Sequence, residues 1–597
     1  MRLRVFLLAA IALMPALPAS AADQPRPQPA KSAHARAIPA QLDEAQRAGY
    51  RAVFASIHAG KWADARLQLA GMKPGPLHDI ALAELLTAKG SPKASLEELS
   101  KLLASAPELP EAEAIARLAA ARGAADLPAL PDTQALIWLG SAPVRARAKA
   151  NRSDLAAAAL AAKMQPFVKE DRGAQAQALL EASTGLSPEV TTEWQQRVAW
   201  IYYLAGDDAN ARVMAAKAAG GAGDWALQAQ WVEGLAAWRQ QDCAAADAAF
   251  SNVATRAGDV EMRAAGLYWS TRAAIACGKP ERVEPRLKQA AQYDETFYGL
   301  LARQALGISA GADRPAPGVV LADWGTLNRR PNIRVAAALV EIDEPGLADE
   351  VLRRQARIGD PEEFAALVSL AEALSLPATQ IWLAHNGPAG FSPPVAARYP
   401  APDWAPQGGW RIDKALVFAH TLQESHFRTN VISPAGAYGL MQIRPAAATD
   451  IARARGTRTD RAALSMPSTN FEIGQSYLEQ LRDRAATSGL LPKVIAAYNA
   501  GPGPVESWNT QIRDGGDPLL YIESIPYWET RGYVITVMRN YWIYERQGGK
   551  TSSPSRQALA QGLWPRFPGL PGAAALRLTG SPQASSAPQA MAATSGN

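Results

Sequence analysis

The sequence contains few of the residues that hold metals, cross-link small folds or form basic surfaces. Only two of its 597 residues are cysteines and six are histidines, and no HExxH pattern or Cys/His cluster occurs. These counts exclude a disulfide-rich fold and argue against a catalytic metal. Lys and Arg are spread along the chain without a basic block, which argues against dedicated nucleic-acid binding. We therefore expect no metal, no other cofactor and no nucleic-acid partner.

Strand-like patterning is also scarce. Hydrophobic residues make up 48% of the chain and aromatic residues 7%, and alanine-rich, helix-forming sequence dominates without long apolar-polar alternation. This composition predicts an all-α protein. A chain of 597 residues is too long for one core, so three or four domains are expected. The formal charge of +5 suits an anionic polymer, but it is equally typical of an ordinary solvated surface.

The N-terminus has the features of an export signal. Arg2 and Arg4 precede an apolar run from Val5 to Leu17 and a small-residue site that ends at Ala21. Residues 1–21 are therefore predicted to be a cleaved signal peptide. No later segment reaches the length of a membrane span, and no cysteine near the cleavage site could carry a lipid. The mature protein is expected to be exported, without an integral membrane segment.

Residues 22–40 are predicted to form a flexible leader and residues 41–310 an α-superhelical domain. Within the latter, turns near Gly173, Gly206, Gln241 and Gly278 recur at about the 34-residue period of tetratricopeptide-like helix pairs. Such pairs stack into a curved solenoid because each buries its apolar stripe only against its neighbours. Six aromatic residues of this region are expected to pack between helices rather than bind sugars: Trp200, Tyr202, Tyr203, Trp269, Phe297 and Tyr298.

The only two cysteines, Cys243 and Cys277, fall at helix-turn positions of the repeat region. In an exported protein an even pair of cysteines suggests one disulfide. The alternative is that both are small, buried hydrophobic residues with free thiols.

Composition divides the rest of the chain. A Gly/Pro-rich break precedes a predicted helical linker domain at residues 311–395. A second segment rich in Pro and Gly, residues 387–410, leads into a C-terminal domain at residues 396–548. Residues 549–597 are mainly Ser, Pro, Ala and Gly, and we expect them to be disordered.

One stretch of the C-terminal domain places a carboxylate where charge is unfavourable. Asp413 has the chemistry of an N-cap, and the residues from Lys414 to Phe427 read as a helix that is apolar almost all round. Glu424 falls in its last turn, near the negative end of the helix dipole and beside a packed interior. Both effects favour the protonated acid, and a raised pKa suits a general acid. The alternative is a structural, partnered glutamate in a core helix.

Turn residues then predict an irregular loop that returns over Glu424. Gln442, near the end of this loop, can both donate to and accept from a substrate amide. No acidic residue lies between Glu424 and Asp450. Because glycosidases usually use two carboxylates, this gap argues against a nearby second acid supplied by the loop.

Four motifs in order form a pattern: Glu424-Ser425, Gly439-Leu440-Met441-Gln442, AAYNAGPG at residues 496–503 and IPYWETRGYV at residues 525–534. Over about residues 400–545, this set resembles the lysozyme-like catalytic domain of the soluble lytic murein transglycosylases. A fifth segment, DETFYGLLARQALG at residues 294–307, resembles the signature that closes the helical superhelix of that family. The resemblance implies a ring-like α-superhelix, a linker region and a C-terminal, mainly α, lysozyme-like domain.

The resemblance assigns roles residue by residue. Glu424 would be the catalytic acid and then the base, and Ser425 would support the loop by a hydrogen bond. Ser433 would contact the substrate N-acetyl group. Gly439 would let the backbone approach the substrate, beside the substrate-binding residues Met441 and Gln442.

The later motifs supply the other implied site residues. Tyr498 would orient the acid or the substrate, and Asn499 would brace the turn after it. Glu529 would position the substrate through polar contacts; its alternative is a buried pair with Arg531. Arg444 stands where the family commonly has methionine, which puts the details of substrate binding in doubt but not the reaction.

The implied reaction is cleavage of the MurNAc-GlcNAc β-1,4 bond of peptidoglycan in the periplasm, with formation of 1,6-anhydro-MurNAc ends. The family architecture further implies an exo-acting monomer. Glycan strands are the expected partner, with cell-wall synthesis or division proteins as further candidates. Two alternatives stay open: a hydrolytic muramidase, and a non-catalytic helical-repeat scaffold of the cell wall.

Overall fold

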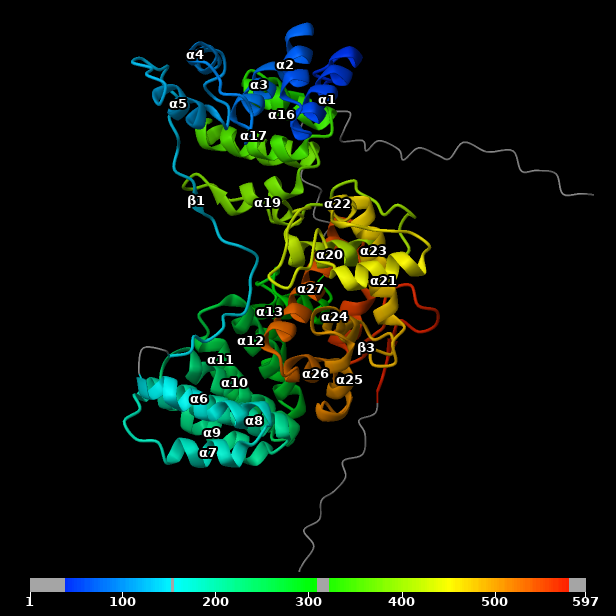
Figure 1. The fold of residues 1–597 in the computed structure, drawn as a ribbon. Helices are drawn as coiled ribbons and strands as arrows, with labels where there is room; N and C mark the ends of the chain where they lie inside the picture. The colour runs from blue at the N-terminus through cyan, green and yellow to red at the C-terminus, as the bar shows by residue number, and fades with distance from the viewer. Residues whose placement is uncertain (1–37, 152–154, 309–320, 579–597) are drawn as a thin grey trace, which may run out of the picture.

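The structure, a computed structural model, describes residues 38–151, 155–308 and 321–578. Within these ranges the regular structure is almost entirely α-helical, and the strands are two-residue segments that form two small antiparallel pairs. The all-α prediction is confirmed. Figure 1 shows two helical lobes at opposite ends of the molecule with the C-terminal domain between them. The predicted signal peptide and most of the predicted leader lie outside the described residues.

The first lobe, which we call the N-terminal lobe, combines two segments that are distant in sequence. Its helices are α1 (Glu44–His58), α2 (Trp62–Gly71), α3 (His78–Thr87), α4 (Leu96–Ser105), α5 (Ala112–Ala120), α15 (Leu321–Leu327), α16 (Pro331–Glu341), α17 (Pro345–Ile358), α18 (Phe364–Ala373) and α19 (Pro377–His385). Tyr50 and Leu99 from the early helices share one apolar core with Leu352 and Phe364 from the late ones. Arg47 also pairs with Glu341 at 2.9 Å across the two segments.

The second lobe, the superhelical lobe, consists of helices α6 to α14. Their bounds are α6 (Leu155–Lys169), α7 (Gly173–Glu181), α8 (Pro188–Ala205), α9 (Asp208–Ala219), α10 (Gly223–Arg239), α11 (Cys243–Arg256), α12 (Val260–Ala276), α13 (Val283–Ala290) and α14 (Phe297–Ala305). Asp171, Gly206, Gln241 and Gly278 all have a positive φ between consecutive helices. The predicted series of turns is therefore confirmed.

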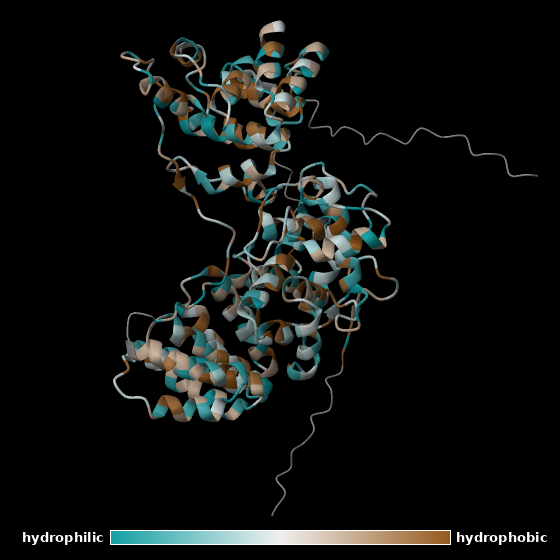
Figure 2. Cartoon of the chain, in the orientation of Figure 1, coloured by the Kyte–Doolittle hydropathy of each residue, from teal (hydrophilic) through white to brown (hydrophobic). Residues whose placement is uncertain are grey.

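The predicted domain at residues 41–310 is divided in the structure. Helices α1 to α5 bury their apolar faces against α15 to α19, whereas α6 to α14 share a core with the C-terminal domain. Residues 121–151 connect the two lobes with little regular structure beyond β1 (Ile137–Trp138), which pairs with β2 (Asn386–Gly387). The sequence did not predict this division, because helical periodicity identifies an apolar face but not the helix that covers it. Trp138 is exposed, and β1 is brown in Figure 2.

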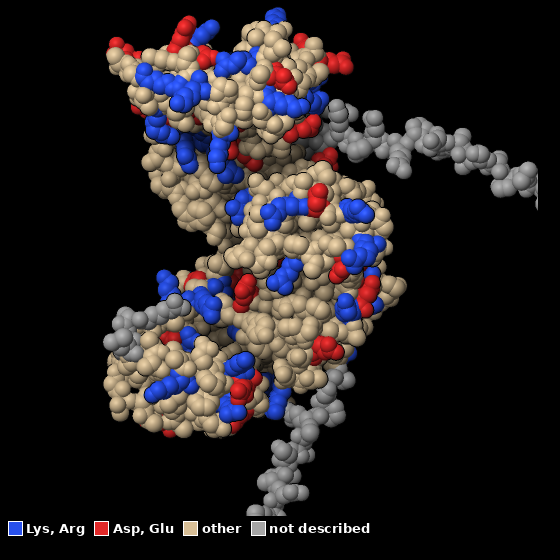
Figure 3. Space-filling model, in the orientation of Figure 1, with Lys and Arg blue, Asp and Glu red and all other residues tan. Residues whose placement is uncertain are grey.

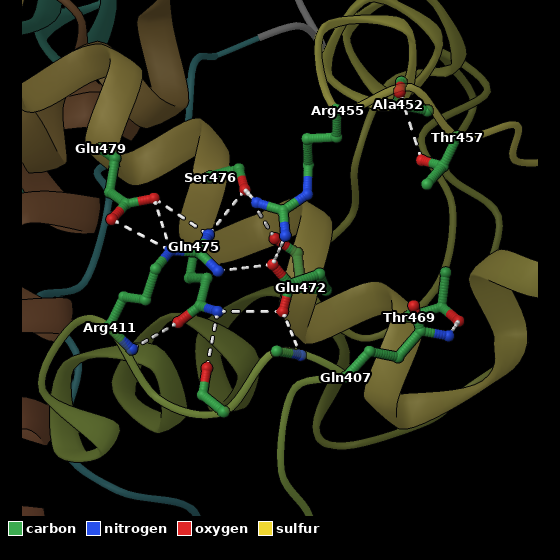
Figure 4. Close-up of polar contacts among 12 residues, drawn as sticks. Gln407, Arg411, Ala452, Arg455, Thr457, Thr469, Glu472, Gln475, Ser476 and Glu479 are labelled. Atoms are coloured by element: carbon green, nitrogen blue, oxygen red, sulfur yellow. Dashed lines mark hydrogen bonds and ion pairs between the residues drawn. The ribbon is translucent and has the colours of Figure 1, made fainter. Parts of the chain in front are cut away.

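The C-terminal domain comprises α20 (Lys414–Ser425), α21 (Pro445–Ala454), α22 (Arg461–Ser465), α23 (Pro467–Arg482), α24 (Leu491–Ala500), α25 (Pro502–Gln511), α26 (Pro518–Ser524) and α27 (Trp528–Gln547). Helices α20 and α27 pack against each other at its centre. The segment that enters the domain is tied to α23 (Figure 4). Glu472 accepts from the Gly408 amide at 2.9 Å and pairs with both Arg411 and Arg455, while Gln475 accepts from the Arg411 amide at 3.1 Å.

The predicted disorder of residues 549–597 is wrong for the part that the structure describes. Helix α28 (Pro554–Ala560) packs on α14, and strands β3 (Trp564–Pro565) and β4 (Ala575–Leu576) pair after it. Ser553 caps the helix, and Trp564 and Phe567 are buried. A few apolar anchors are enough to hold a segment whose average composition is that of a disordered tail. Residues 579–597 lie outside the described residues.

The described surface carries mixed charge. Figure 3 shows Lys and Arg side chains interspersed with Asp and Glu over the visible face. None of the helices in the described ranges combines the length and the hydropathy that a membrane span requires.

The structure joins Cys243, at the start of α11, to Cys277, at the end of α12, in a disulfide that closes a 34-residue separation. A cross-link of this span restricts the unfolded chain. Replacing both cysteines by serine is expected to lower the free energy of unfolding by about 2–4 kcal/mol. Urea unfolding with and without a reductant measures this. Reduction should lower the midpoint of the wild type only; equal midpoints for wild type and variant would show that the bond is absent in the native protein.

Candidate active site

Helix α20 presents Glu424 at its C-terminal end. Asp413 caps the helix by accepting from the Ala415 amide at 3.0 Å, as predicted. The helix ends at Ser425, two residues earlier than predicted, because His426 and Phe427 adopt the left-handed conformation with φ of 50° and 60°. These two residues turn the chain sharply. Glu424 therefore stands in the last helical turn, where the chain leaves the core.

The carboxyl group of Glu424 is mostly buried and has a defined partner. Burial raises the pKa of Glu424 to about 7. The Tyr533 hydroxyl donates to Oε1 at 2.6 Å, which lowers this pKa, and the negative charge of Glu529 raises it. Near neutral pH the acid and the carboxylate are both populated, so one group can give a proton and take one back.

The loop after α20 is held by short backbone bridges. Tyr438 pairs with both Ile432 and Ile443. The Ser433 amide donates to the Ala437 carbonyl and the Ala437 amide donates to the Ser433 hydroxyl, both at 3.0 Å. Ser433 is thus built into the turn that the sequence predicted, and its own hydroxyl proton is still available to a ligand.

The motif Gly439 to Gln442 folds against α23. Gly439 has φ of 76°, and a Cβ there would lie 2.6 Å from the Leu464 carbonyl oxygen, so only glycine fits. The Met441 side chain is fully buried and its amide donates to Asn470 at 2.9 Å. Met441 therefore supports the loop from below. This differs from its predicted role in substrate binding, because its side chain cannot reach a ligand.

Gln442 is also more constrained than predicted. Its φ is 47°, and its side-chain nitrogen donates to the carbonyl oxygens of Val431 at 3.0 Å and Gly439 at 2.9 Å. A primary amide has two hydrogens, and both are used inside the loop. Gln442 can then meet a substrate only as an acceptor through Oε1.

Tyr498 and Asn499 lie at the end of α24 and brace neighbouring elements. The Tyr498 hydroxyl donates to the Met441 carbonyl at 2.7 Å, so it holds the loop and not Glu424. Asn499 accepts from Thr530 at 2.6 Å, which fits the predicted bracing role. The hydroxyl of Ser425 donates to Thr421 within its own helix at 3.2 Å, whereas its carbonyl accepts from Arg428 in the loop.

Glu529 stands in the first turn of α27 with its side chain exposed. The alternative of a buried pair with Arg531 is wrong. The Arg531 guanidinium lies 4.3 Å from the Trp200 ring centroid and donates to the Ile525 carbonyl at 3.1 Å. Glu529 is one helical turn before Tyr533, which explains its effect on Glu424.

Sequence reasoning missed two residues of the site. Tyr533 belongs to the motif at residues 525–534 but was not singled out, although it lies one turn after Glu529 on the same helix face. His420 lies outside all of the motifs. In the structure its ring is fully buried, and Nδ1 lies 2.9 Å from the Tyr533 hydroxyl. The available signal was the four-residue spacing of His420 and Glu424 on α20.

A cavity of about 1000 Å³ lies where the superhelical lobe meets the C-terminal domain. Six aromatic side chains line it, three from each side: Trp200, Trp225, Trp231, Trp508, Tyr527 and Trp528. Trp200 was expected only to pack between helices. Arg145, Arg197 and Arg531 also line the wall, where Arg145 is paired with Glu523 and Arg197 with Glu193.

A smaller cavity of about 180 Å³ shares Arg145, Trp528 and Arg531 with the large one. It is also lined by Glu529 and Tyr533, which adjoin Glu424. The smaller cavity therefore lies near Glu424 and shares part of its wall with the large one.

Comparison with known proteins places this geometry in a family. Residues 405–518 match the Transglycosylase SLT domain. The soluble lytic murein transglycosylase of Salmonella typhimurium is 39% identical over 132 residues, which are 22% of this chain and 20% of that protein. Residues 405–518 therefore form a domain of the transglycosylase SLT family.

Other relatives match over similar lengths. The soluble lytic murein transglycosylase of Escherichia coli K12 is 38% identical over 132 residues, or 22% of this chain and 20% of that protein. The membrane-bound lytic murein transglycosylase C of Histophilus somni is 35% identical over 106 residues, or 16% and 29% of the two chains. The match thus spans about a fifth of the length of the soluble transglycosylases (20%).

Solved structures extend the likeness in fold beyond this domain. An inactive mutant of the lytic transglycosylase Slt from Pseudomonas aeruginosa superposes with a TM-score of 0.52 at 19% identity, over 85% of this chain and 87% of that one. The 70-kDa soluble lytic transglycosylase in complex with bulgecin A gives 0.53 at 17% identity, over 88% and 99%. The superhelical architecture is thus that of the soluble lytic transglycosylases.

The raised pKa of Glu424 makes stability depend on pH. Because the folded-state pKa of about 7 exceeds the ordinary value of 4.5, stability is fully present below 4.5 and is lost as pH rises through 7. Glu424→Gln removes this loss. Its free energy of unfolding, relative to wild type, is expected to grow by about 1–3 kcal/mol between pH 4 and pH 8. Urea unfolding at both pH values measures the change; a constant difference would show that the Glu424 pKa is not raised.

Proposed function

We propose that this chain is a periplasmic lytic transglycosylase that cleaves the MurNAc-GlcNAc β-1,4 bond of peptidoglycan and leaves 1,6-anhydro-MurNAc ends. The observation that carries the proposal is the Glu424 carboxyl group, which is mostly buried, hydrogen-bonded to Tyr533 and half protonated near neutral pH. The membership of the SLT domain family supports peptidoglycan as the substrate.

In the proposed reaction, Glu424 first donates its proton to the glycosidic oxygen, and the bond between that oxygen and MurNAc C1 breaks. The N-acetyl carbonyl of MurNAc stabilises the cationic C1. The Glu424 carboxylate then removes the proton from the MurNAc C6 hydroxyl, and O6 bonds to C1. Glu424 ends protonated as it began, and no water is consumed.

The placement of Glu529 supports this one-acid scheme. Glu529 is exposed at the start of α27, and the loop from Ser425 to Thr449 contains no carboxylate. A hydrolytic glycosidase needs a second carboxylate placed on the opposite face of the sugar. We assign Glu529 a polar contact with the substrate, and Ser433 and Gln442 contacts with its N-acetyl and amide groups.

The cavity between the lobes supports an extended substrate. Aromatic faces suit sugar rings. We propose that a peptidoglycan strand reaches from Glu424 along the smaller cavity toward the aromatic wall. An exo-acting mode fits this arrangement, because the superhelical lobe stands at one end of the path.

The end group of the products tests the reaction. Purified mature protein is expected to release muropeptides with 1,6-anhydro ends from isolated sacculi, as measured by mass spectrometry. Glu424→Gln should lower turnover by at least about 1000-fold, because no other acid can protonate the leaving oxygen. Glu529→Gln is the matched control and should retain activity with a weaker substrate interaction. Reducing ends would establish a hydrolase, and no release from folded protein would favour the scaffold.

The role of the large cavity is tested at Tyr527, whose side chain is 53% exposed and packs against Trp508. Tyr527→Ala should raise KM for soluble glycan strands about 3- to 10-fold with little change in kcat, because one ring contact of the bound strand is lost. Leu67→Ala, at a 74% exposed site in the N-terminal lobe, is the control. An unchanged KM would place the substrate elsewhere.

A further inference from the structure

His420 is a buried polar residue that the proposed reaction does not use. Its side chain is fully buried in the middle of α20, one turn before Glu424. The ring packs 4.5 Å from that of Tyr498 on α24 and 5.8 Å from that of Tyr533 on α27, measured between centroids. A histidine inside a core has a cost unless its nitrogens have partners, so its hydrogen bonds are informative.

The hydrogen bonds fix which ring nitrogen carries the proton. Tyr533 has one hydroxyl proton, which it donates to Oε1 of Glu424 at 2.6 Å; this oxygen accepts both in the carboxylate and in the acid protonated on Oε2. Since that proton goes to Glu424, His420 must be the donor in its 2.9 Å contact with the Tyr533 oxygen, through Nδ1–H. Its Nε2 is buried without a partner among the described residues. In the Nδ1–H tautomer this atom carries no hydrogen, so no buried N–H is left unpaired.

The surroundings of His420 keep its ring in one protonation state. Burial lowers the pKa of His420 to about 3, so the ring is neutral at the pH of activity. The titratable groups that face it are Tyr498 and Tyr533, both with pKa values raised by burial. Beyond them, the charge of Glu424 raises the pKa of Tyr533, and the charge of Glu529 raises the pKa of Glu424.

We infer that His420 is a positioning residue: it donates Nδ1–H to Tyr533, commits the Tyr533 proton to Oε1 of Glu424, and leaves Oε2 as the oxygen that carries the transferable proton. The chain of donors runs in one direction, from the ring through the phenol to the acid. Each bond polarises the next, so Tyr533 becomes a stronger donor to the carboxylate. The last step, transfer from Oε2, rests on the proposed function, whereas the tautomer and the chain of donors do not.

Two substitutions of His420 distinguish the effect of its hydrogen-bond donor from the effect of its packing. In His420→Asn the side-chain amide nitrogen takes about the position of Nδ1 and keeps a donor, whereas His420→Leu fills space without one. For His420→Leu we expect kcat about 10-fold lower, KM within about 2-fold and the basic limb of the pH profile shifted upward, because the Glu424 carboxylate loses support. His420→Asn should stay within about 3-fold of wild type. Equal losses in both variants would overturn the inference.

A double variant tests whether His420 acts through Tyr533. Tyr533→Phe should itself shift the basic limb upward, and adding His420→Leu to it should change kcat and the pH profile no further. Additive losses would mean that His420 acts by another route. Thermal unfolding of each variant identifies any loss that comes from misfolding alone.

The tautomer can be read without any substrate. In protein labelled with ¹⁵N-histidine, the His420 signals, assigned by their absence in His420→Asn, should show a protonated Nδ1 and an unprotonated Nε2 from about pH 5 to 8. The opposite tautomer, or protonation within this range, would overturn the inference. If the wild type releases no muropeptides but shows the Nδ1–H tautomer, the proposed function fails while the assigned chain of donors stands.

Discussion

The hydrogen bond from Tyr533 to Glu424 is the contact on which the site depends, because it opposes the burial of the same carboxyl group. Burial favours the protonated form of Glu424, and full solvation would leave it ionised. One donor at 2.6 Å, set within a packed helix interface, keeps the acid between these limits. The packing of α20 on α27 is therefore part of the chemistry, since it sets the distance between the two side chains.

The loop over Glu424 is prepared in advance by bonds that a substrate does not have to make. Gln442 uses both of its amide hydrogens on loop carbonyls, and Tyr498 holds the Met441 carbonyl. Groups that are fixed before binding lose little entropy when the ligand arrives. The consequence is a site that presents acceptors and backbone groups in place around Glu424, the proposed acid.

Local features of this molecule could be predicted from sequence, whereas long-range partners could not. The cap at Asp413, the place of Glu424 in the last turn and the left-handed turns at Gly206 and Gly278 follow from a few neighbouring residues. The division of residues 41–310 between two cores could not be predicted, because α1 to α5 bury their faces on helices more than 200 residues away.

For the same reason, the sequence did not indicate which side chains contact one another inside the site. Tyr533 and His420 are ordinary core residues until α20 and α27 are placed together, and the burial of Met441 depends on α23 beneath it. Motif resemblance indicates Glu424 as the candidate acid. It does not indicate which atoms of the other motif residues are already used within the protein.

The superhelical lobe does more than carry the C-terminal domain, because a buried polar network joins them just before α27. Burial alone would raise the pKa of Glu523, but Arg145 from the connector, with two bonds of 2.7 and 3.0 Å, holds it below its ordinary value. Tyr298 of α14 donates to the same carboxylate at 2.6 Å, and Tyr203 of α8 bonds Ser524 at 2.7 Å. Removing one partner of such a pair leaves an unpaired buried charge.

This network fixes the end of α26 to three parts of the superhelical side. Helix α27, which carries Glu529 and Tyr533, begins four residues later. The position of the donor to Glu424 is thus set from outside the C-terminal domain as well as within it.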